Sequence, residues 1–390
     1  MSRIELADRV KNLPPYPFAA LDAAKAKAKA EGKDIISLGI GDPDLPTPGF
    51  IVDELKKAAA DPATHQYPDY TGRLDYRQVC ADFMKRRFGV EFDGASEILA
   101  LIGSKEGIAH IPLAYINPGD FALCPNPGYP VYDVATQFAG GQVKYFTLDE
   151  DRKFLPDLGG IPAEWAQRAK LMFLNYPNNP TGAVATVETL QPVVDFCRER
   201  NILLVYDNAY SELAFDGYKP ISIFQVPGAK EIAIEMHSLS KSFNMTGWRI
   251  AWAAGNADYI AGLGKIKTNV DSGAFDAIQL AAMEALRRNE DPIVTQNYAT
   301  YGARRAACEK KLTEMGISFL KSPATFYVWC KVPTDEKSAA FCQRILSNTG
   351  VVVTPGTAFG SLGEGYFRIA LTVPERRMIE ALDRIAGQLG

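Results

Sequence analysis

From about residue 50 onward, short apolar runs alternate with stretches of helical period. This alternation is typical of an α/β fold, in which helices cover both faces of a mostly parallel sheet. The apolar runs before residue 285 lie at 98–101, 121–124, 143–146, 171–174, 202–206, 232–236 and 250–253. We therefore predict a large domain built on a mostly parallel, seven-stranded sheet.

The remaining residues predict a second, smaller α+β domain, for which a chain of 390 residues has room. A polar helical stretch at 289–314 leads into the predicted strands 317–320, 325–330, 351–353 and 366–371. We expect residues 1–49, with a helix at 20–31 and a strand at 34–38, to join this smaller domain. The predicted division is thus 1–49 (N-terminal segment), 50–285 (large domain) and 286–390 (small domain).

Charge and composition exclude several classes of partner. Forty-two basic and 46 acidic residues give a net charge of −4, which does not favour binding to nucleic acid or to an anionic membrane. The first nine residues alternate charged with apolar side chains, unlike a signal peptide, so we expect a cytoplasmic protein. The six cysteines form no C-x-x-C pair and the three histidines show no metal-ligand spacing, so no metal site is predicted.

The stretch 237–249 carries the most distinctive chemistry, directly after a predicted buried strand. Lys241 directly follows Ser238 and Ser240 in the chain, and Arg249 comes eight residues later. A lone lysine is usually a solvated surface charge. Here an amine able to form a Schiff base is accompanied by hydroxyls and a guanidinium that suit a phosphate, which together predict a phosphorylated aldehyde as ligand. Pyridoxal 5'-phosphate (PLP) is the candidate.

Polar residues also follow other predicted strands. The turn 103–107 opens a helix whose free N–H groups suit a phosphate, and the turn 175–182 presents asparagine amides from a rigid, proline-rich loop. Asp207 ends an apolar strand, where a carboxylate needs a cationic partner or loses its charge. The alternatives are a helix N-cap for Asp207 and self-bonded Asx turns for the asparagines, above all for Asn178.

The tract 238–250 resembles the lysine loop of class I/II aminotransferases of fold type I, which are PLP enzymes, and the turns at 103–107, 126–132, 175–182 and 207–210 match that family in order. The resemblance implies the following roles in cofactor binding and catalysis. Lys241 would hold PLP and act as general base; Asp207 would bind the pyridine N1–H; Tyr210 and Asn179 would contact O3'; Tyr129 would stack on the ring; and Gly103, Ser104, Lys105, Ser238, Ser240 and Arg249 would hold the phosphate.

The resemblance also implies substrate and partner contacts. Arg368 would grip the substrate α-carboxylate, with Tyr16, Gly41, Lys105, Tyr129 and Asn179 around the same substrate. Tyr70 would reach the phosphate of the other subunit, which implies a homodimer with shared active sites. From residue chemistry alone, a lone strand arginine such as Arg368 is more often a surface salt-bridge partner, and Tyr70 and Tyr129 are loop aromatics.

The predicted function is a ping-pong transaminase that moves an amino group between an amino acid and a keto acid. The tracts 39–48, 103–107 and 267–275 most resemble the LL-diaminopimelate aminotransferases, which implies LL-diaminopimelate and 2-oxoglutarate as substrates in lysine biosynthesis. Alternatives are an aspartate, alanine or broad-specificity aminotransferase, a PLP-dependent β-lyase and a non-catalytic regulator. Some relatives carry a glutamate near Tyr70 and Thr71 that this chain lacks. Lys267 either binds a side-chain carboxylate of the substrate or is a surface or structural lysine.

Overall fold

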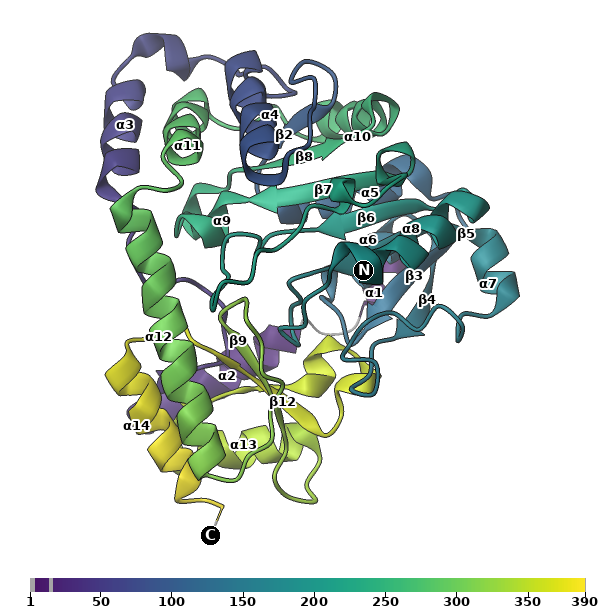
Figure 1. Ribbon diagram of the computed structural model, residues 1–390. Helices are drawn as coiled ribbons and strands as arrows, with labels where there is room; N and C mark the ends of the chain where they lie inside the picture. The colour runs from purple at the N-terminus through teal and green to yellow at the C-terminus, as the bar shows by residue number, and fades with distance from the viewer. Residues whose placement is uncertain (1–3, 14–16, 390) are drawn as a thin grey trace.

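The computed structural model describes residues 4–13 and 17–389. Within these residues, the large sheet has seven strands in the order β2-β8-β7-β6-β5-β3-β4 (Figure 1). β8 is antiparallel to both of its neighbours and the other pairs are parallel. The strands are β2 (Ile98–Leu101), β3 (Phe121–Asn126), β4 (Gln142–Thr147), β5 (Ala169–Asn175), β6 (Leu203–Asp207), β7 (Ala233–Ser238) and β8 (Ala251–Gly255). All seven sequence predictions are confirmed.

Helices pack on both faces of this sheet. Leu203 and Val205 of β6 point into a cluster with α5 (Ser104–Tyr115), α6 (Val131–Phe138) and α10 (Ala257–Val270). Leu204 and Tyr206 point the other way, into a cluster with α7 (Ala163–Arg168) and α8 (Val187–Arg200). Beside them, α3 (Gly49–Ala59), α4 (Leu74–Phe88) and α11 (Asp276–Arg287) cover β2 and β8. Burial on both faces explains why the strands are apolar throughout.

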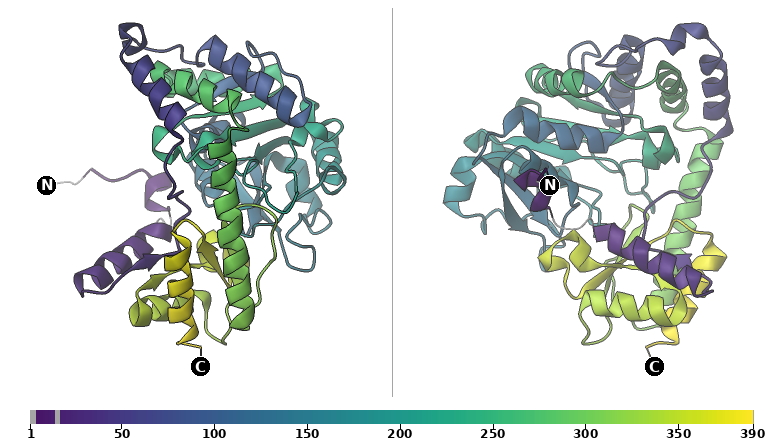
Figure 2. Two further views of the ribbon diagram at one scale, coloured as in Figure 1. Left: turned by 60° about the vertical axis from the view of Figure 1, so that its left-hand side comes forward. Right: turned by 180° about the vertical axis from the view of Figure 1, so that it is seen from behind.

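The long helix α12 (Pro292–Glu314) leads from the layer of α11 to the C-terminal part of the molecule (Figures 1 and 2). It starts at Pro292, three residues later than predicted, because Asp291 caps it by accepting from the Ile293 N–H at 3.1 Å. The C-terminal part contains the antiparallel sheet β11-β12-β9, with β9 (Tyr327–Lys331), β11 (Thr354–Pro355) and β12 (Tyr366–Ala370), and the helices α13 (Ser338–Thr349) and α14 (Glu375–Ala386).

The N-terminal segment pairs with the C-terminal part, because β1 (Ile36–Ser37) lies parallel to β10 (Val351–Val352).

The predicted strand 317–320 is wrong: Phe319 forms one isolated bridge with Cys330, and the chain then turns away through Pro323. The proposed boundaries at 49/50 and 285/286 stay predictions. The other helices are α1 (Asp8–Lys11), α2 (Pro17–Ala30), α9 (Leu239–Ser242) and the 3-10 turns η1 (Pro62–His65), η2 (Ile223–Gln225), η3 (Ala229–Glu231), η4 (Thr246–Trp248), η5 (Gly356–Phe359) and η6 (Ser361–Gly363).

Candidate active site

A cavity of about 420 Å³ lies where the loops after the large-sheet strands meet the C-terminal sheet. This position, beyond the carboxyl ends of parallel strands, is where α/β folds place their ligands. Most of the site residues predicted from sequence line it: Gly41, Ser104, Lys105, Tyr129, Asn179, Asp207, Tyr210, Ser238, Ser240, Lys241, Arg249 and Arg368. Gly103 sits next to the cavity, at the N-cap of α5.

Lys241 lies on α9, a short helix that begins directly after β7. The Ser238 hydroxyl caps this helix by accepting from the Ser240 N–H at 3.2 Å, which fixes the direction of the turn. The Lys241 Nζ donates to the Gly41 carbonyl at 2.9 Å. Burial lowers the pKa of the Lys241 amine from 10.5 to about 8. A neutral amine, which is the nucleophilic form, is therefore accessible near physiological pH.

Asp207 is the last residue of β6 and is 5% exposed. Its Oδ2 accepts from the Tyr132 hydroxyl at 2.9 Å, whereas its Oδ1 is buried and has no hydrogen-bond partner within the part of the chain that the structure describes. Burial raises the pKa of this carboxyl from 3.8 to about 6. A buried carboxylate oxygen that lacks a donor beside a cavity fits a ligand that presents a cationic N–H, such as the pyridine ring of PLP.

Two cations and the start of a helix form an anion-binding corner. Ser104 and Lys105 occupy the first turn of α5, whose N–H groups have no partner within the helix. Gly103 has φ +80°, and a Cβ at this position would overlap the guanidinium of Arg249. Burial, followed by the charge of Arg249, lowers the pKa of Lys105. This corner suits a phosphate dianion. Its negative charge would compensate Lys105 for the solvation lost on burial and would reduce the repulsion between Lys105 and Arg249.

The asparagine turn after β5 is held by its own hydrogen bonds. Asn175 donates from Nδ2 to the Asp207 carbonyl at 2.6 Å and accepts the Asn179 N–H at Oδ1, also at 2.6 Å. Asn178 accepts from the backbone N–H and the hydroxyl of Thr181. Its side chain therefore bonds its own turn, which is the alternative that the sequence indicates for this residue. Because Asn179 accepts at Oδ1 from Arg368 at 2.6 Å, its NH₂ group is left to donate.

Arg368 comes from β12 and is buried. Its second guanidinium nitrogen donates to the Gly39 carbonyl at 2.8 Å, and its Cζ lies 4.1 Å from the centre of the Tyr327 ring. Tyr327 in turn lies with its hydroxyl 3.2 Å from the hydroxyl of Tyr210. The surface salt-bridge alternative for Arg368 is therefore wrong, because the guanidinium is buried and lies in the cavity wall, where a substrate carboxylate could reach it.

Tyr129 lines the cavity and contacts Tyr132 edge-on, with ring centres 5.8 Å apart. Tyr70 is 46% exposed and does not line this cavity, so its reach to a second subunit stays a prediction. Tyr16 lies outside the described residues.

The sequence did not single out every residue of the cavity wall. Tyr327 was included in a predicted strand, but its place beside Arg368 depends on strand register. Ile40, Gly41 and Asp42, which belong to the glycine- and proline-rich loop 39–48, line the cavity. The density of glycine and proline in this loop was the available signal. The lining residues that the predictions omitted or used only as support are Ile40, Asp42, Asn175, Ala209, Thr246 and Tyr327.

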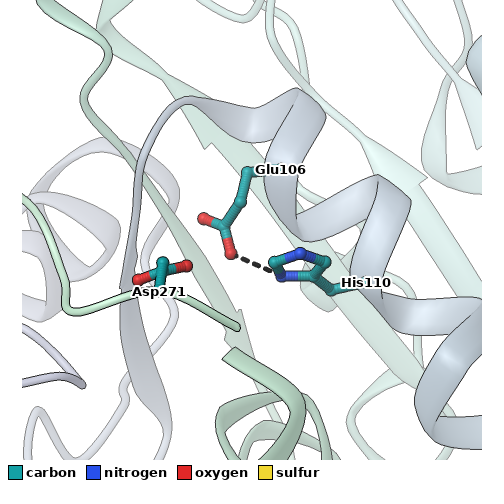
Figure 3. Close-up of side chains that lie close together, drawn as sticks. All are labelled: Glu106, His110 and Asp271. Atoms are coloured by element: carbon teal, nitrogen blue, oxygen red, sulfur yellow. Dashed lines mark ion pairs between the residues drawn. The ribbon is translucent and has the colours of Figure 1, made fainter. Parts of the chain in front are cut away.

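One group of possible metal ligands occurs among the described residues: Glu106, His110 and Asp271 (Figure 3). The His110 Nδ1 lies 2.8 Å from Glu106. Lys267 is 1% exposed, and its Nζ lies 2.8 Å from Asp271 and 3.4 Å from Glu106. Its ammonium already supplies positive charge to both carboxylates, so the cluster is an ion-pair network. Of the two roles considered for Lys267, these contacts favour the structural one.

Residues 33–385 match the family model described as aminotransferase class I and II. The chain belongs to this family. A relative named LL-diaminopimelate aminotransferase, from Nitratidesulfovibrio vulgaris, is 53% identical over 387 residues, which cover 99% of this chain and 100% of the relative. A relative of the same name from Aquifex aeolicus is 51% identical over 381 residues, 98% of each chain.

A solved structure shares the fold of this aminotransferase along nearly its whole length. Substrate-bound BacF from Bacillus subtilis superposes with a TM-score of 0.95 at 35% identity and covers 99% of this chain and 98% of its own. The family and fold type predicted from the five motifs are thus confirmed, and the protein is an aminotransferase acting on amino and keto acids. Within residues 4–13 and 17–389, no helix has the length and apolar character needed to cross a membrane.

Proposed function

We propose that this aminotransferase binds PLP in the cavity through Lys241. The observation that carries the proposal is the buried Asp207 Oδ1, which has no donor within the described chain and lines the same cavity as an amine of lowered pKa. When bound, PLP accepts the electron pair released as the Cα–H bond of an amino acid breaks. Asp207 would hold the proton at the pyridine N1, and Lys241 would carry the proton between Cα and the cofactor carbon.

The other cavity residues would orient the two ligands. Ser104, Lys105, Ser238, Ser240 and Arg249, with the backbone of Gly103, would hold the phosphate. Tyr129 would stack on the pyridine ring, and Asn179 and Tyr210 would donate to its O3'. Arg368 would bind the substrate α-carboxylate with both guanidinium nitrogens, as a planar fork does.

We further propose LL-diaminopimelate and 2-oxoglutarate as the amino donor and acceptor, in lysine biosynthesis. Support comes from full-length relatives at 51–53% identity that bear the name LL-diaminopimelate aminotransferase. The tracts 39–48 and 267–275 add support from the sequence. Lys267 is held by two carboxylates of its own chain, so its contacts do not favour a role in reading an aspartate-like side-chain carboxylate.

A homodimer completes the proposal. Tyr70 is 46% exposed in a loop whose backbone packs against Gly273, so it is available to a second copy of the chain. In that arrangement Tyr70 would contact the partner's phosphate. We also propose a cytoplasmic location; the six cysteines are buried and unpaired, as is usual in a reducing compartment.

The test is a donor panel with 2-oxoglutarate as acceptor: LL-diaminopimelate, aspartate, alanine and aromatic amino acids, with glutamate formation as the readout. Fastest turnover is expected with LL-diaminopimelate, and no turnover with this donor would refute the specific substrate. Lys241→Ala should lose both turnover and the visible absorbance of bound PLP. Release of pyruvate and ammonia without an acceptor would instead indicate β-lyase activity. If no donor reacts and PLP does not bind, the general proposal fails.

A further inference from the structure

Tyr327 is a buried residue in the cavity wall that the assigned chemistry does not use. It is the first residue of β9, is 4% exposed and lines the cavity together with Tyr210, Lys241 and Arg368. Its hydroxyl and its ring make different contacts, and each contact reaches a residue with a proposed role. This combination indicates that the side chain does more than fill space.

The hydroxyl of Tyr327 lies 3.2 Å from the hydroxyl of Tyr210, and the two ring centres are 5.6 Å apart at 72°. Burial raises the pKa of the Tyr210 phenol well above its usual value, so its proton is retained. Each hydroxyl has one hydrogen to donate. If the Tyr327 hydroxyl donates to the Tyr210 oxygen, the hydrogen of Tyr210 is left to donate to a ligand in the cavity.

The ring of Tyr327 contacts Arg368 because of the strand register. In the β9–β12 pair, Tyr327 lies opposite Ala370 and Trp329 lies opposite Arg368, so Tyr327 and Arg368 are diagonal neighbours on one face of the sheet. The Arg368 Cζ is 4.1 Å from the ring centre. A desolvated guanidinium over an aromatic face is held by a cation–π interaction.

The hydroxyl also approaches the loop 39–48, which contributes residues 40–42 to the cavity wall. A Cβ at Gly41 would overlap the Tyr327 hydroxyl, so the loop can lie this close because residue 41 is glycine. The Gly41 carbonyl accepts from the Lys241 Nζ at 2.9 Å. Tyr327 thus packs against the backbone that contacts the nucleophilic amine.

We propose that Tyr327 is a positioning residue of this aminotransferase: its hydroxyl directs the hydrogen of Tyr210 toward the cofactor, and its ring fixes the plane of the Arg368 guanidinium for the substrate carboxylate. This inference rests on the proposed function. The two roles belong to different parts of one side chain, so substitution can separate them.

The test compares Tyr327→Phe and Tyr327→Leu in the PLP-loaded enzyme. One readout is the pH midpoint of the visible absorbance of bound PLP, and the other is the dissociation constant of glutarate, an unreactive dicarboxylate, measured by calorimetry. Tyr327→Phe loses the hydroxyl and should raise the midpoint by about 0.5 to 1 pH unit, because a weaker donor at O3' stabilises the deprotonated form less. Its glutarate affinity should stay within about twofold of wild type, because the ring remains.

Tyr327→Leu removes the ring as well and should weaken glutarate binding about tenfold in addition to the shift in midpoint. If the Tyr327→Leu variant does not fold, the Tyr327→Met variant is measured in its place. The matched control is Tyr366→Phe. Tyr366 belongs to the same small sheet, stacks on Trp329 and places its hydroxyl 3.3 Å from Glu150, but it is not among the residues that line the cavity.

The control should match wild type in both readouts. A Tyr327→Phe midpoint equal to that of wild type would overturn the role of the hydroxyl. Unchanged glutarate affinity in the Leu or Met variant would overturn the role of the ring. The wild-type enzyme should show a visible absorbance of bound PLP that the Lys241→Ala variant lacks. If it does not, the proposed function is refuted. This inference then fails with it, whatever the Tyr327 variants show.

Discussion

Replacing Asp207 with asparagine should stabilise the cofactor-free protein at neutral pH and, at the same time, weaken PLP binding. Asparagine has nearly the same shape, so the change removes the charge and little else. In the cofactor-free protein, the ionised carboxylate is buried with one oxygen that has no donor within the described chain. In the loaded enzyme, that oxygen would accept the N1 proton of the pyridinium.

The size of the first effect follows from the carboxyl pKa. Its rise from 3.8 to about 6 corresponds to a cost of about 3 kcal/mol when the group is ionised in the folded state. Because the folded-state pKa is the higher one, the folded protein is penalised progressively as pH rises from 3.8 to 6, and the full penalty applies above 6. Asp207→Asn should therefore gain up to about 3 kcal/mol at pH 7.5, and about half of that at pH 5.

The assay is urea unfolding of cofactor-free protein at both pH values, combined with PLP titration. Loss of a hydrogen bond between charged groups should weaken PLP binding by about 10- to 100-fold. Asp151→Asn, at an exposed carboxylate in a turn, is the control and should change neither quantity. An Asp207→Asn protein that is less stable than wild type at pH 7.5, or that binds PLP equally well, would refute the reasoning.

Further predictions concern the cations and the loop. Because burial lowers the Lys241 pKa to about 8, PLP uptake by cofactor-free protein should accelerate with pH and level off above about 8 in stopped-flow absorbance; a rate constant that is flat from pH 7 to 9 would contradict this. Arg368→Lys keeps the charge but loses the planar fork, so KM for the amino donor should rise about tenfold or more in steady-state assays, with a smaller change in kcat. Gly41→Ala should cost about 1 to 3 kcal/mol in urea unfolding through overlap with Tyr327, whereas Gly49→Ala, with open space around its Cβ, should cost much less.

The large sheet could be predicted because a parallel strand buried on both faces is an unbroken apolar run, and such runs are visible without knowing their neighbours. The position of Asp207 could be predicted for the same reason, because it is the first charged residue after such a run. The failed strand 317–320 shows the limit of this signal. An apolar run reports burial, and Phe319 is packed against the core without forming an extended ladder.

Residues whose role depends on distant partners could not be predicted in the same way. Tyr327 looks like any strand aromatic until the register with β12 places it beside Arg368. Lys267 had two open interpretations because Asp271 is close to it in the chain whereas its second partner, Glu106, lies 161 positions away. Tyr70 depends on a second subunit, so neither the sequence nor a single chain decides its contacts.

The carbonyls of Gly39 and Gly41 have a consequence for ligand selection. The Gly39 carbonyl accepts a hydrogen bond from Arg368, and the Gly41 carbonyl accepts one from Lys241. An anion that binds to either side chain therefore has to replace a hydrogen bond that already exists. A ligand gains only the difference between its own contact and the main-chain contact that it displaces. We expect a small carboxylate with a single point of attachment to gain little from this exchange, and a molecule with further contacts in the cavity to gain more. We therefore expect the two carbonyls to compete with simple metabolite anions for Arg368 and Lys241.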